Sequence, residues 1–378
     1  MAERSTATVR ILCEAMEHIA PTWAAAEWDN VGLLVGDPAR PVRRVLLAID
    51  LTAAVLSEAR RGRFEAVVAY HPPLFRPVTR FVVGTLDQHS VAAEAAASGM
   101  AVYSPHTALD AAAGGPNDTL AALAGLKDAV PFEAAASGPD KCKLVVFVPP
   151  ERVDAIAEAV FDAGAGRIGQ YEKCSFRLAG QGTFFGTEST APAVGRRGRF
   201  ERVDEIRLEV ILPRIRLPDV TAAVRRAHPY DEPAFDVYPL QRLPDGRIGQ
   251  GRIGRFARRK TLAALARSMK QKTGAANVVT VGGPARSLCR GLVCVGAAGS
   301  LPFDMPATPC GPGDVVITGE IRHHDALCYR RSGVAAIALG HWASERPVLK
   351  PLARRLAAML NRVTVVVSRS DRDPFGSV

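Results

Sequence analysis

The sequence is poor in aromatic residues and has no hydrophobic segment long enough to cross a membrane. Aromatic residues make up only 6% of the 378 residues, whereas the hydrophobic fraction is 48%, so the core must consist mainly of Ala, Val, Leu and Ile. No apolar run reaches the ~18 residues that a spanning helix needs. The first residues lack the charged-then-apolar pattern of a secretory signal. We therefore expect a cytoplasmic protein with no membrane segment.

The chain also lacks paired cysteines. Its seven cysteines form an odd set without any C-x-x-C spacing, which argues against a disulfide scaffold and against a thiolate zinc site. Small buried thiols are the simpler interpretation. The net charge of +10, from 48 basic and 38 acidic residues, permits nucleic-acid or phosphate partners. The basic surplus is scattered arginine, which a coding bias would also produce.

The order of apolar segments predicts two α/β regions. In the first, the strand Val45–Asp50, the helix Thr52–Arg61 and the strand Phe64–Tyr70 repeat the rhythm of βαβ units. The same rhythm returns near the C-terminus, where Asp314–Thr318 and Val334–Leu339 are expected strands. We expect two related α/β halves, residues 1–129 and 247–378, each with a mainly parallel sheet.

Between these halves lies a segment, residues 130–246, whose expected elements follow a different order. Its expected elements follow the order βαββαβ of the ferredoxin-like split motif. They are Lys143–Val148, Glu151–Gly164, Arg177–Thr187, Val203–Leu212, Leu217–Ala227 and Phe235–Leu240. The fold class is therefore α/β, with an inserted α+β domain. After the last expected strand, Val363–Val367, we expect a loose tail over Ser368–Val378.

Three short polar clusters follow expected buried strands. They are Tyr70-His71-Pro72-Pro73, the segment from His106 to Asp110, and the segment from His341 to Glu345. Strand ends in an open α/β sheet line the crevice where ligands bind, so these residues could converge. Imidazole nitrogens and carboxylate oxygens suit divalent transition metals. The clusters therefore predict a metal site.

Each cluster also has a simpler interpretation. Glu345 could merely complement a helix dipole, His71 could be a turn residue, and Asp110 could cap backbone amides. Taken together, their positions after strands of one sheet edge favour the metal site. His323 and His324 follow Thr318-Gly319-Glu320, and they could line the same cleft or form an ordinary polar first turn.

Five motifs, in this order along the chain, resemble the Nif-three-like family. The family is also known as the dinuclear metal center hexameric proteins and as GTP cyclohydrolase I type 2. The resemblance runs from about Ile11 to Leu360, and the segment Pro229–Phe235 resembles the family's PII-like or CutA-like insert. The motifs are residues 28–36, 70–75, 106–110, 318–320 and 340–345.

The resemblance implies a fold, an assembly and a set of site residues. It implies two three-layer halves with a PII-like insert, and a toroidal homohexamer built as a trimer of dimers. It implies one or two divalent ions per chain (zinc, iron, manganese or magnesium), with Glu345 bridging two ions. The implied metal ligands are His71, Asp110, His341 and Glu345, with His106, His323 and His324 as near neighbours. Of these neighbours, His106 is a possible further ligand, and His323 and His324 are our candidate catalytic residues.

One position departs from the family pattern. Many bacterial members have histidine where this chain has Tyr70, and a neutral phenol with a pKa near ~10 is a poor ligand for most divalent ions. The second metal site could therefore be weak, empty, or completed by His106, His324 or water.

These observations give three hypotheses about function. The first is a divalent-metal hydrolase of a nucleotide or phosphate-bearing small molecule, in line with the family label GTP cyclohydrolase I type 2. In it, His323 or His324 moves the proton. The alternative is a non-catalytic metal-binding or regulatory hexamer, or an interaction protein. The third is a basic nucleic-acid-binding ring, whose binding would depend steeply on salt.

Overall fold

The computed structural model describes residues 7–82, 88–136, 140–190, 192–242, 244–304 and 310–376. The chain forms two units. The main unit comprises Met1–Ser137 and Pro244–Val378, and the inserted unit comprises Gly138–Leu243. No helix in the described ranges combines the length and the apolar character that a membrane crossing requires.

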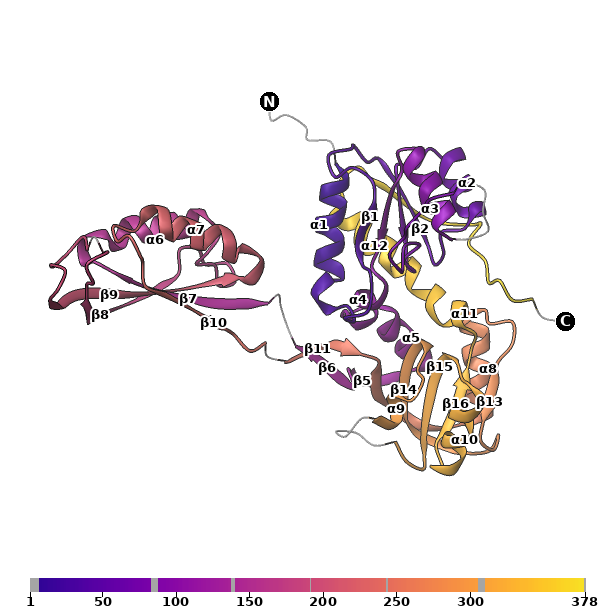
Figure 1. Ribbon diagram of the computed structural model, residues 1–378. Helices are drawn as coiled ribbons and strands as arrows, with labels where there is room; N and C mark the ends of the chain where they lie inside the picture. Colours follow the sequence, from indigo (N-terminus) through magenta and orange to yellow (C-terminus); the bar gives the residue numbers. More distant parts are fainter. Residues whose placement is uncertain are drawn as a thin grey trace. The chain divides into compact units, whose positions relative to one another are not determined.

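The first sheet of the main unit, of which Figure 1 labels β1 and β2, has the strand order β1-β4-β3-β2-β17. Strands β2, β3, β4 and β17 are parallel to their neighbours, and β1 runs antiparallel to β4. β3 is buried along its whole length, as expected for a central parallel strand covered on both faces. The bounds are Gly32–Val35 (β1), Arg44–Ala48 (β2), Ala66–Ala69 (β3), Ala101–Ser104 (β4) and Thr364–Val367 (β17).

Helices cover both faces of this sheet. Helix α1 (Val9–Ile19) and helix α12 (Leu349–Met359) pack on one core, and α2 (Ala53–Arg61) and α3 (Gln88–Ala97) lie at the other. α1 buries residues at helical spacing on one stripe. At the start of α2 the Thr52 side chain accepts a hydrogen bond from the Val55 amide, an N-cap. This layering is the α/β architecture that the sequence predicts.

The second sheet has the order β13-β16-β15-β14-β12-β5, with β14, β15 and β16 parallel and the other pairs antiparallel. Its strands are Leu126–Val130 (β5), Arg252–Thr261 (β12), Val279–Val281 (β13), Ser287–Ala297 (β14), Asp314–Glu320 (β15) and Ala335–Ala338 (β16). The helices near it are α5 (Pro116–Ala124), α8 (Leu262–Thr273), α9 (Leu301–Asp304), α10 (His323–Arg331) and α11 (His341–Glu345), whereas α4 (His106–Ala111) packs into the core of the first sheet. A two-stranded sheet joins β6 (Glu133–Ala136) to β11 (Pro244–Gln250).

The two halves exchange edge strands. β5 comes from the first half of the chain but pairs with β12 in the second sheet. β17, the expected strand Val363–Val367, pairs with β2 in the first sheet. An apolar run predicts a strand but does not identify its sheet. The preceding helix α12 directs β17 to the first sheet, because α12 buries its apolar stripe in the core of that sheet.

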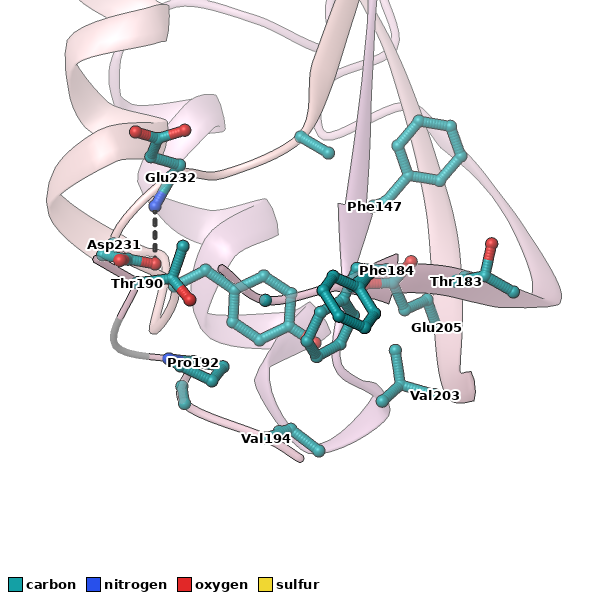
Figure 2. Close-up of a pocket in the computed structure, with 16 residues that line it drawn as sticks. Phe147, Thr183, Phe184, Thr190, Pro192, Val194, Val203, Glu205, Asp231 and Glu232 are labelled. Atoms are coloured by element: carbon teal, nitrogen blue, oxygen red, sulfur yellow. Dashed lines mark hydrogen bonds between the residues drawn. The ribbon is translucent and has the colours of Figure 1, made fainter. Parts of the chain in front are cut away.

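The inserted unit has the element order βαββαβ and the strand order β10-β7-β9-β8, all antiparallel. Helices α6 and α7 pack over one face, on alternate residues of β7 and β9. Beyond the end of β7, β8 and β9 continue as a two-stranded ribbon that lines a pocket (Figure 2). The bounds are Lys141–Val148 (β7), Val153–Asp162 (α6), Ser175–Phe185 (β8), Phe200–Pro213 (β9), Leu217–Ala227 (α7) and Phe235–Pro239 (β10).

Candidate metal centre

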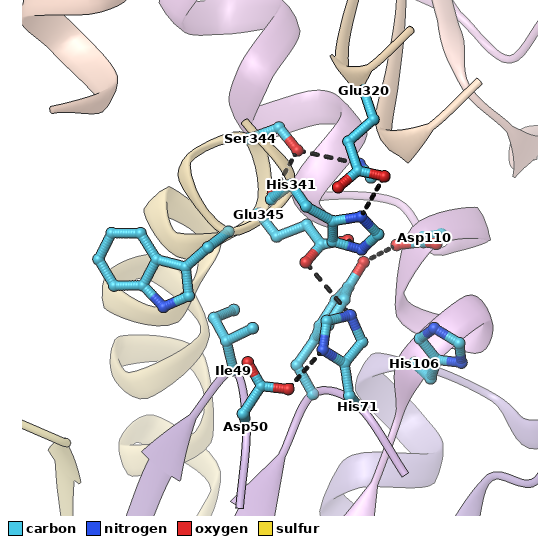
Figure 3. A network of polar contacts seen from close by, with 12 residues as sticks. Ile49, Asp50, His71, His106, Asp110, Glu320, His341, Ser344 and Glu345 are labelled. Atoms are coloured by element: carbon cyan, nitrogen blue, oxygen red, sulfur yellow. Dashed lines mark hydrogen bonds and ion pairs between the residues drawn. The ribbon is translucent and has the colours of Figure 1, made fainter. Parts of the chain in front are cut away.

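Three side chains with metal-binding chemistry converge at strand ends of the main unit. His71 follows β3 of the first sheet, and His341 follows β16 of the second sheet at the start of α11. Glu345 lies one turn later on α11, with only 3% of its surface exposed. The site therefore lies where the carboxyl ends of two sheets meet, as Figure 3 shows.

The spacing of these side chains fits a single ion. Nε2 of His71 lies 3.3 Å from Oε2 of Glu345, and Nε2 of His341 lies 3.2 Å from Oε1. One ligand atom from each residue lies within 4.8 Å of the others. Bonds of about 2.1 Å to one ion would separate its ligands by about 3.4 Å in tetrahedral geometry. The three residues could thus bind a metal ion.

Carboxylates orient both imidazole rings. Nδ1 of His71 is 2.9 Å from Oδ1 of Asp50, and Nδ1 of His341 is 3.4 Å from Oε2 of Glu320. Such pairing fixes the ring and directs Nε2 toward a metal. Neither Asp50 nor Glu320 has a role that the sequence predicts. Their positions at the ends of expected strands were the available signal.

In the absence of an ion, protons occupy the imidazole nitrogens that would bind it, so a divalent ion has to displace these protons. Burial alone would lower the pKa of His71, but the hydrogen bond to Asp50 and the nearby Glu345 carboxylate outweigh it and raise the pKa to about 10. The hydrogen bond to Glu345 raises the pKa of His341 to about 9. Burial acts to raise the pKa of Glu345, yet the two histidines lower it. Without metal, two protonated rings therefore surround one carboxylate.

Two features indicate that room is kept for a further group. Oε2 of Glu345 is buried and makes no well-directed hydrogen bond, although Nε2 of His71 is near. An unsatisfied buried oxygen is costly unless something binds it. Gly296, with φ of 63°, faces the same carboxylate, and a Cβ there would lie 2.8 Å from Oε1 of Glu345. The residues present therefore fit a bound cation.

Asp110 lies beside this group but is bound to another partner. The Tyr70 hydroxyl donates a hydrogen bond to Oδ1 of Asp110. Burial raises the pKa of Asp110 to about 7, with Glu345 adding to the effect and the Tyr70 hydrogen bond opposing it. Burial also holds the pKa of Tyr70 well above its usual value, so this phenol keeps its proton. The structure brings Asp110 to the site, but outside the group of three.

His106 lines the site next to His71. The two ring centroids are 5.4 Å apart. Nδ1 of His106 is 2.8 Å from Oδ1 of Asp29, and the Thr107 backbone amide also donates to Asp29. A third histidine is thus oriented by a carboxylate in the same manner as His71 and His341.

His323 and His324 are placed differently. Both are exposed at the start of α10, and their rings contact each other at 5.5 Å between centroids. In the described part of the chain, neither forms a hydrogen bond or ion pair with His71, His341 or Glu345. Their acid–base role stays a prediction.

The comparisons with known proteins agree with the fold. A family model described as Duf34/NIF3 (NGG1p interacting factor 3) matches residues 7–374. A Mycobacterium leprae protein named GTP cyclohydrolase 1 type 2 homolog is 36% identical over 341 residues, covering 88% of this chain and 86% of its own length.

Solved structures extend the comparison to three dimensions. A Bacillus cereus protein related to NIF3 is 30% identical and has a TM-score of 0.68, covering 99% of this chain and 100% of its own. A Staphylococcus aureus protein, 24% identical with a TM-score of 0.74, shares the fold, covering 100% of both chains. The chain therefore belongs to the Duf34/NIF3 family.

Proposed function

We propose that this protein is a divalent-metal-dependent hydrolase of a nucleotide or another phosphate-bearing small molecule. One observation carries the proposal: a buried carboxylate with an unsatisfied oxygen faces two imidazoles whose other nitrogens are held by carboxylates. That donor set suits zinc, iron or manganese better than magnesium, which prefers oxygen ligands.

Two groups of residues would form the metal site, the ligands of the ion and the carboxylates that orient them. His71, His341 and Glu345 would hold the ion, and Asp50 and Glu320 would keep the two rings in place. When bound, the ion supplies Lewis-acid polarisation of the substrate and lowers the pKa of a water molecule toward ~7.

Proton transfer has several candidate groups. Asp110 is one of them when no second ion is bound, because burial raises its pKa to about 7. His323 and His324 remain the candidates from the sequence, although they would have to act through substrate or water.

A second ion is the finer part of the proposal. Asp110 and His106 would supply its ligands, and Glu345 would bridge the two ions. The Tyr70 hydrogen bond to Asp110 competes with this arrangement. We therefore expect the second ion to bind more weakly than the first.

A pocket beside the site supports a planar, anionic substrate. It has a volume of about 470 Å³ and is lined by Trp28, Phe75, Arg76 and Phe81. The rings of Trp28 and Phe75 lie 6.1 and 6.5 Å from that of His106, which links the pocket to the metal centre. Exposed aromatic faces can stack on a base. Arg76 makes no ion pair within the described ranges and could bind a phosphate.

The assembly and location are also proposals. We infer from family membership a cytoplasmic homohexamer, arranged as a trimer of dimers. The exposed rings of Trp28 (64% exposed) and Phe81 (57%) are consistent with a surface that a substrate or a second copy covers. Light scattering coupled to size exclusion would test the hexamer.

The central test is metal content combined with turnover. Protein purified without chelator is analysed for metal, and then assayed against GTP and other nucleoside phosphates before and after metal removal. His341→Ala should lose both metal and turnover. His18→Ala, which removes an exposed histidine of α1, should lose neither. Turnover that survives metal removal would overturn the proposal.

The contact between Tyr70 and Asp110 also favours the second candidate, a non-catalytic metal-binding or regulatory protein. Such a protein would bind one ion and lose thermal stability or assembly in His341→Ala, without turnover of any substrate tested. A nucleic-acid-binding ring would instead retain binding in this variant and lose it steeply with salt.

A further inference from the structure

The inserted unit contains a pocket that plays no part in the metal centre. Its volume is about 440 Å³, and every lining residue belongs to the inserted unit. This volume falls within the ~300–1,000 Å³ of small-molecule sites. Its wall includes Tyr230, Asp231 and Glu232, which belong to the motif Pro229–Phe235 singled out in the sequence but not used by the proposed function.

The ribbon of β8 and β9 supplies another wall. Gly182 pairs with Val203, so these two residues share a face with Phe184 and Glu205, each two positions further along its strand. All four line the pocket, together with Phe147 of β7 (Figure 2). The wall thus combines aromatic and aliphatic surface with one carboxylate.

The Glu205 carboxylate is held in place by its neighbours. A side chain at Gly182 would collide with it, so glycine leaves the space that the carboxylate occupies. The Tyr230 hydroxyl donates to Glu205; burial, the Glu205 charge and this hydrogen bond together raise the pKa of Tyr230 to about 12. The Asp231 carboxylate accepts from the Glu232 amide at 3.1 Å. The carboxylates of Glu205 and Asp231 are therefore each oriented by a specific contact.

No positive charge offsets them. Among the described lining residues there is no Lys, Arg or His, and Glu205, Asp231 and Glu232 pair with no basic side chain in the described ranges. His228 stacks edge-on against Tyr230 at 4.8 Å, but burial lowers its pKa and keeps it neutral. Of the three carboxylates, Glu205 is half-buried, whereas Asp231 and Glu232 are exposed. A partly desolvated carboxylate and aromatic faces both attract cations.

We propose that this pocket binds a small organic cation, an amine or guanidine with an apolar body. Glu205 pairs with the cationic group, and Phe147, Phe184 and Val203 contact the apolar body. The site does not depend on the metal centre, so it would operate whether or not the main unit is an enzyme.

The test uses the full chain and three probes. 4-Phenylbutylamine carries both features, 4-phenylbutan-1-ol lacks the charge, and butylamine lacks the ring. Calorimetry should give a Kd of ~1 mM or tighter for the first probe. Either partial probe should bind at least about tenfold more weakly.

Two isosteric variants test whether 4-phenylbutylamine binds at Glu205. Glu205→Gln, which can still accept the Tyr230 hydrogen bond, should weaken 4-phenylbutylamine at least about tenfold. Asp204→Asn removes the neighbouring exposed carboxylate, which does not line the pocket, and should change nothing. The proposal is overturned if 4-phenylbutylamine does not bind, if butylamine binds equally well, or if Glu205→Gln has no effect. Circular dichroism of both variants checks that the fold is retained.

Discussion

At the scale of single residues, the site is built from histidines that carboxylates hold in one orientation. His71, His106 and His341 each pair through Nδ1 with an acidic side chain. This arrangement leaves Nε2 as the nitrogen available for a ligand. The acidic partners would therefore contribute to metal affinity without touching the ion.

The first prediction concerns Asp50, the partner of His71. Asp50→Asn should weaken metal binding by about 10–100-fold, because the His71 ring loses its orienting carboxylate. Competition with a chromophoric chelator would measure the change. Asp37→Asn, which removes an exposed turn carboxylate, is the matched control. Equal affinities in the two variants would contradict the prediction.

The second prediction concerns Tyr70. Tyr70→Phe removes the hydrogen bond to Asp110 and should free that carboxylate for a second ion, although the freed group stays buried. Tyr70→His should go further and add a ligand nitrogen. Metal content per chain should therefore rise in the order wild type, Tyr70→Phe, Tyr70→His. A constant metal content across the series would show that Tyr70 does not limit the second ion.

At the scale of elements, the segment after β17 is hydrogen-bonded to the first half of the chain. The expectation of a loose tail over residues 368–378 is wrong for its first part, because Ser368 and Asp371 are buried. Asp371 accepts hydrogen bonds from the Ile49 amide and from Nε1 of Trp342. Its place after the last strand suggested a free tail, but Ser368 and Asp371 each find specific hydrogen-bond partners.

The third prediction follows from Glu58, on α2, which holds this tail. Burial would raise its pKa, but hydrogen bonds from the Ser368 hydroxyl and from the amides of Arg369 and Ser370 lower it to about 2. A carboxylate with a depressed pKa contributes stability above its unfolded value, near 4.5, and loses it as the pH falls toward 2. Glu58→Gln should therefore cost about 1 kcal/mol at neutral pH and flatten the stability profile in this acid range.

Thermal unfolding of the wild type and Glu58→Gln between pH 7 and pH 2 would measure this effect. Glu94→Gln is a useful control, since Glu94 pairs with Arg60 on the surface and does not contact the tail. A difference between wild type and Glu58→Gln that persists undiminished in acid would contradict the assigned role.

The sequence was sufficient to predict many of the elements and part of the site. It was not sufficient for features that depend on contacts between distant residues. Strands such as β2, β3, β15 and β16 were predictable because each is a short apolar run, whereas the arginine-rich β12 was not. His71, His341 and Glu345 were predictable because they follow apolar runs. The exchange of β5 and β17 was not, since pairing depends on distant contacts. The Tyr70 contact with Asp110 joins residues 40 positions apart, and only the folded chain reveals it.

At the scale of the whole molecule, the inserted unit leaves the main unit through neighbouring strands. Ala136 on β6 pairs with Pro244 on β11, so the two ends of the main unit lie side by side. The metal centre and both sheets of the main unit use no residue of the inserted unit.

The fourth prediction is that the insert can be removed. A chain in which a short Gly-Ser linker replaces residues 138–243 should fold and bind metal with the affinity of the full chain. It should lose the binding of 4-phenylbutylamine, which the pocket of the inserted unit provides. Loss of metal binding in a folded, shortened chain would show that the insert supports the metal centre.

The exchanged strand β17 has a consequence for how the protein is made. The first sheet contains residues 32–104, but its edge beside β2 is completed only by Thr364–Val367. A ribosome adds residues at about 5–20 per second, so this edge stays unpaired for most of synthesis. An uncovered strand edge is open to pairing with other chains. Nascent chains stalled before residue 364 should therefore bind chaperones or aggregate, whereas released chains should not.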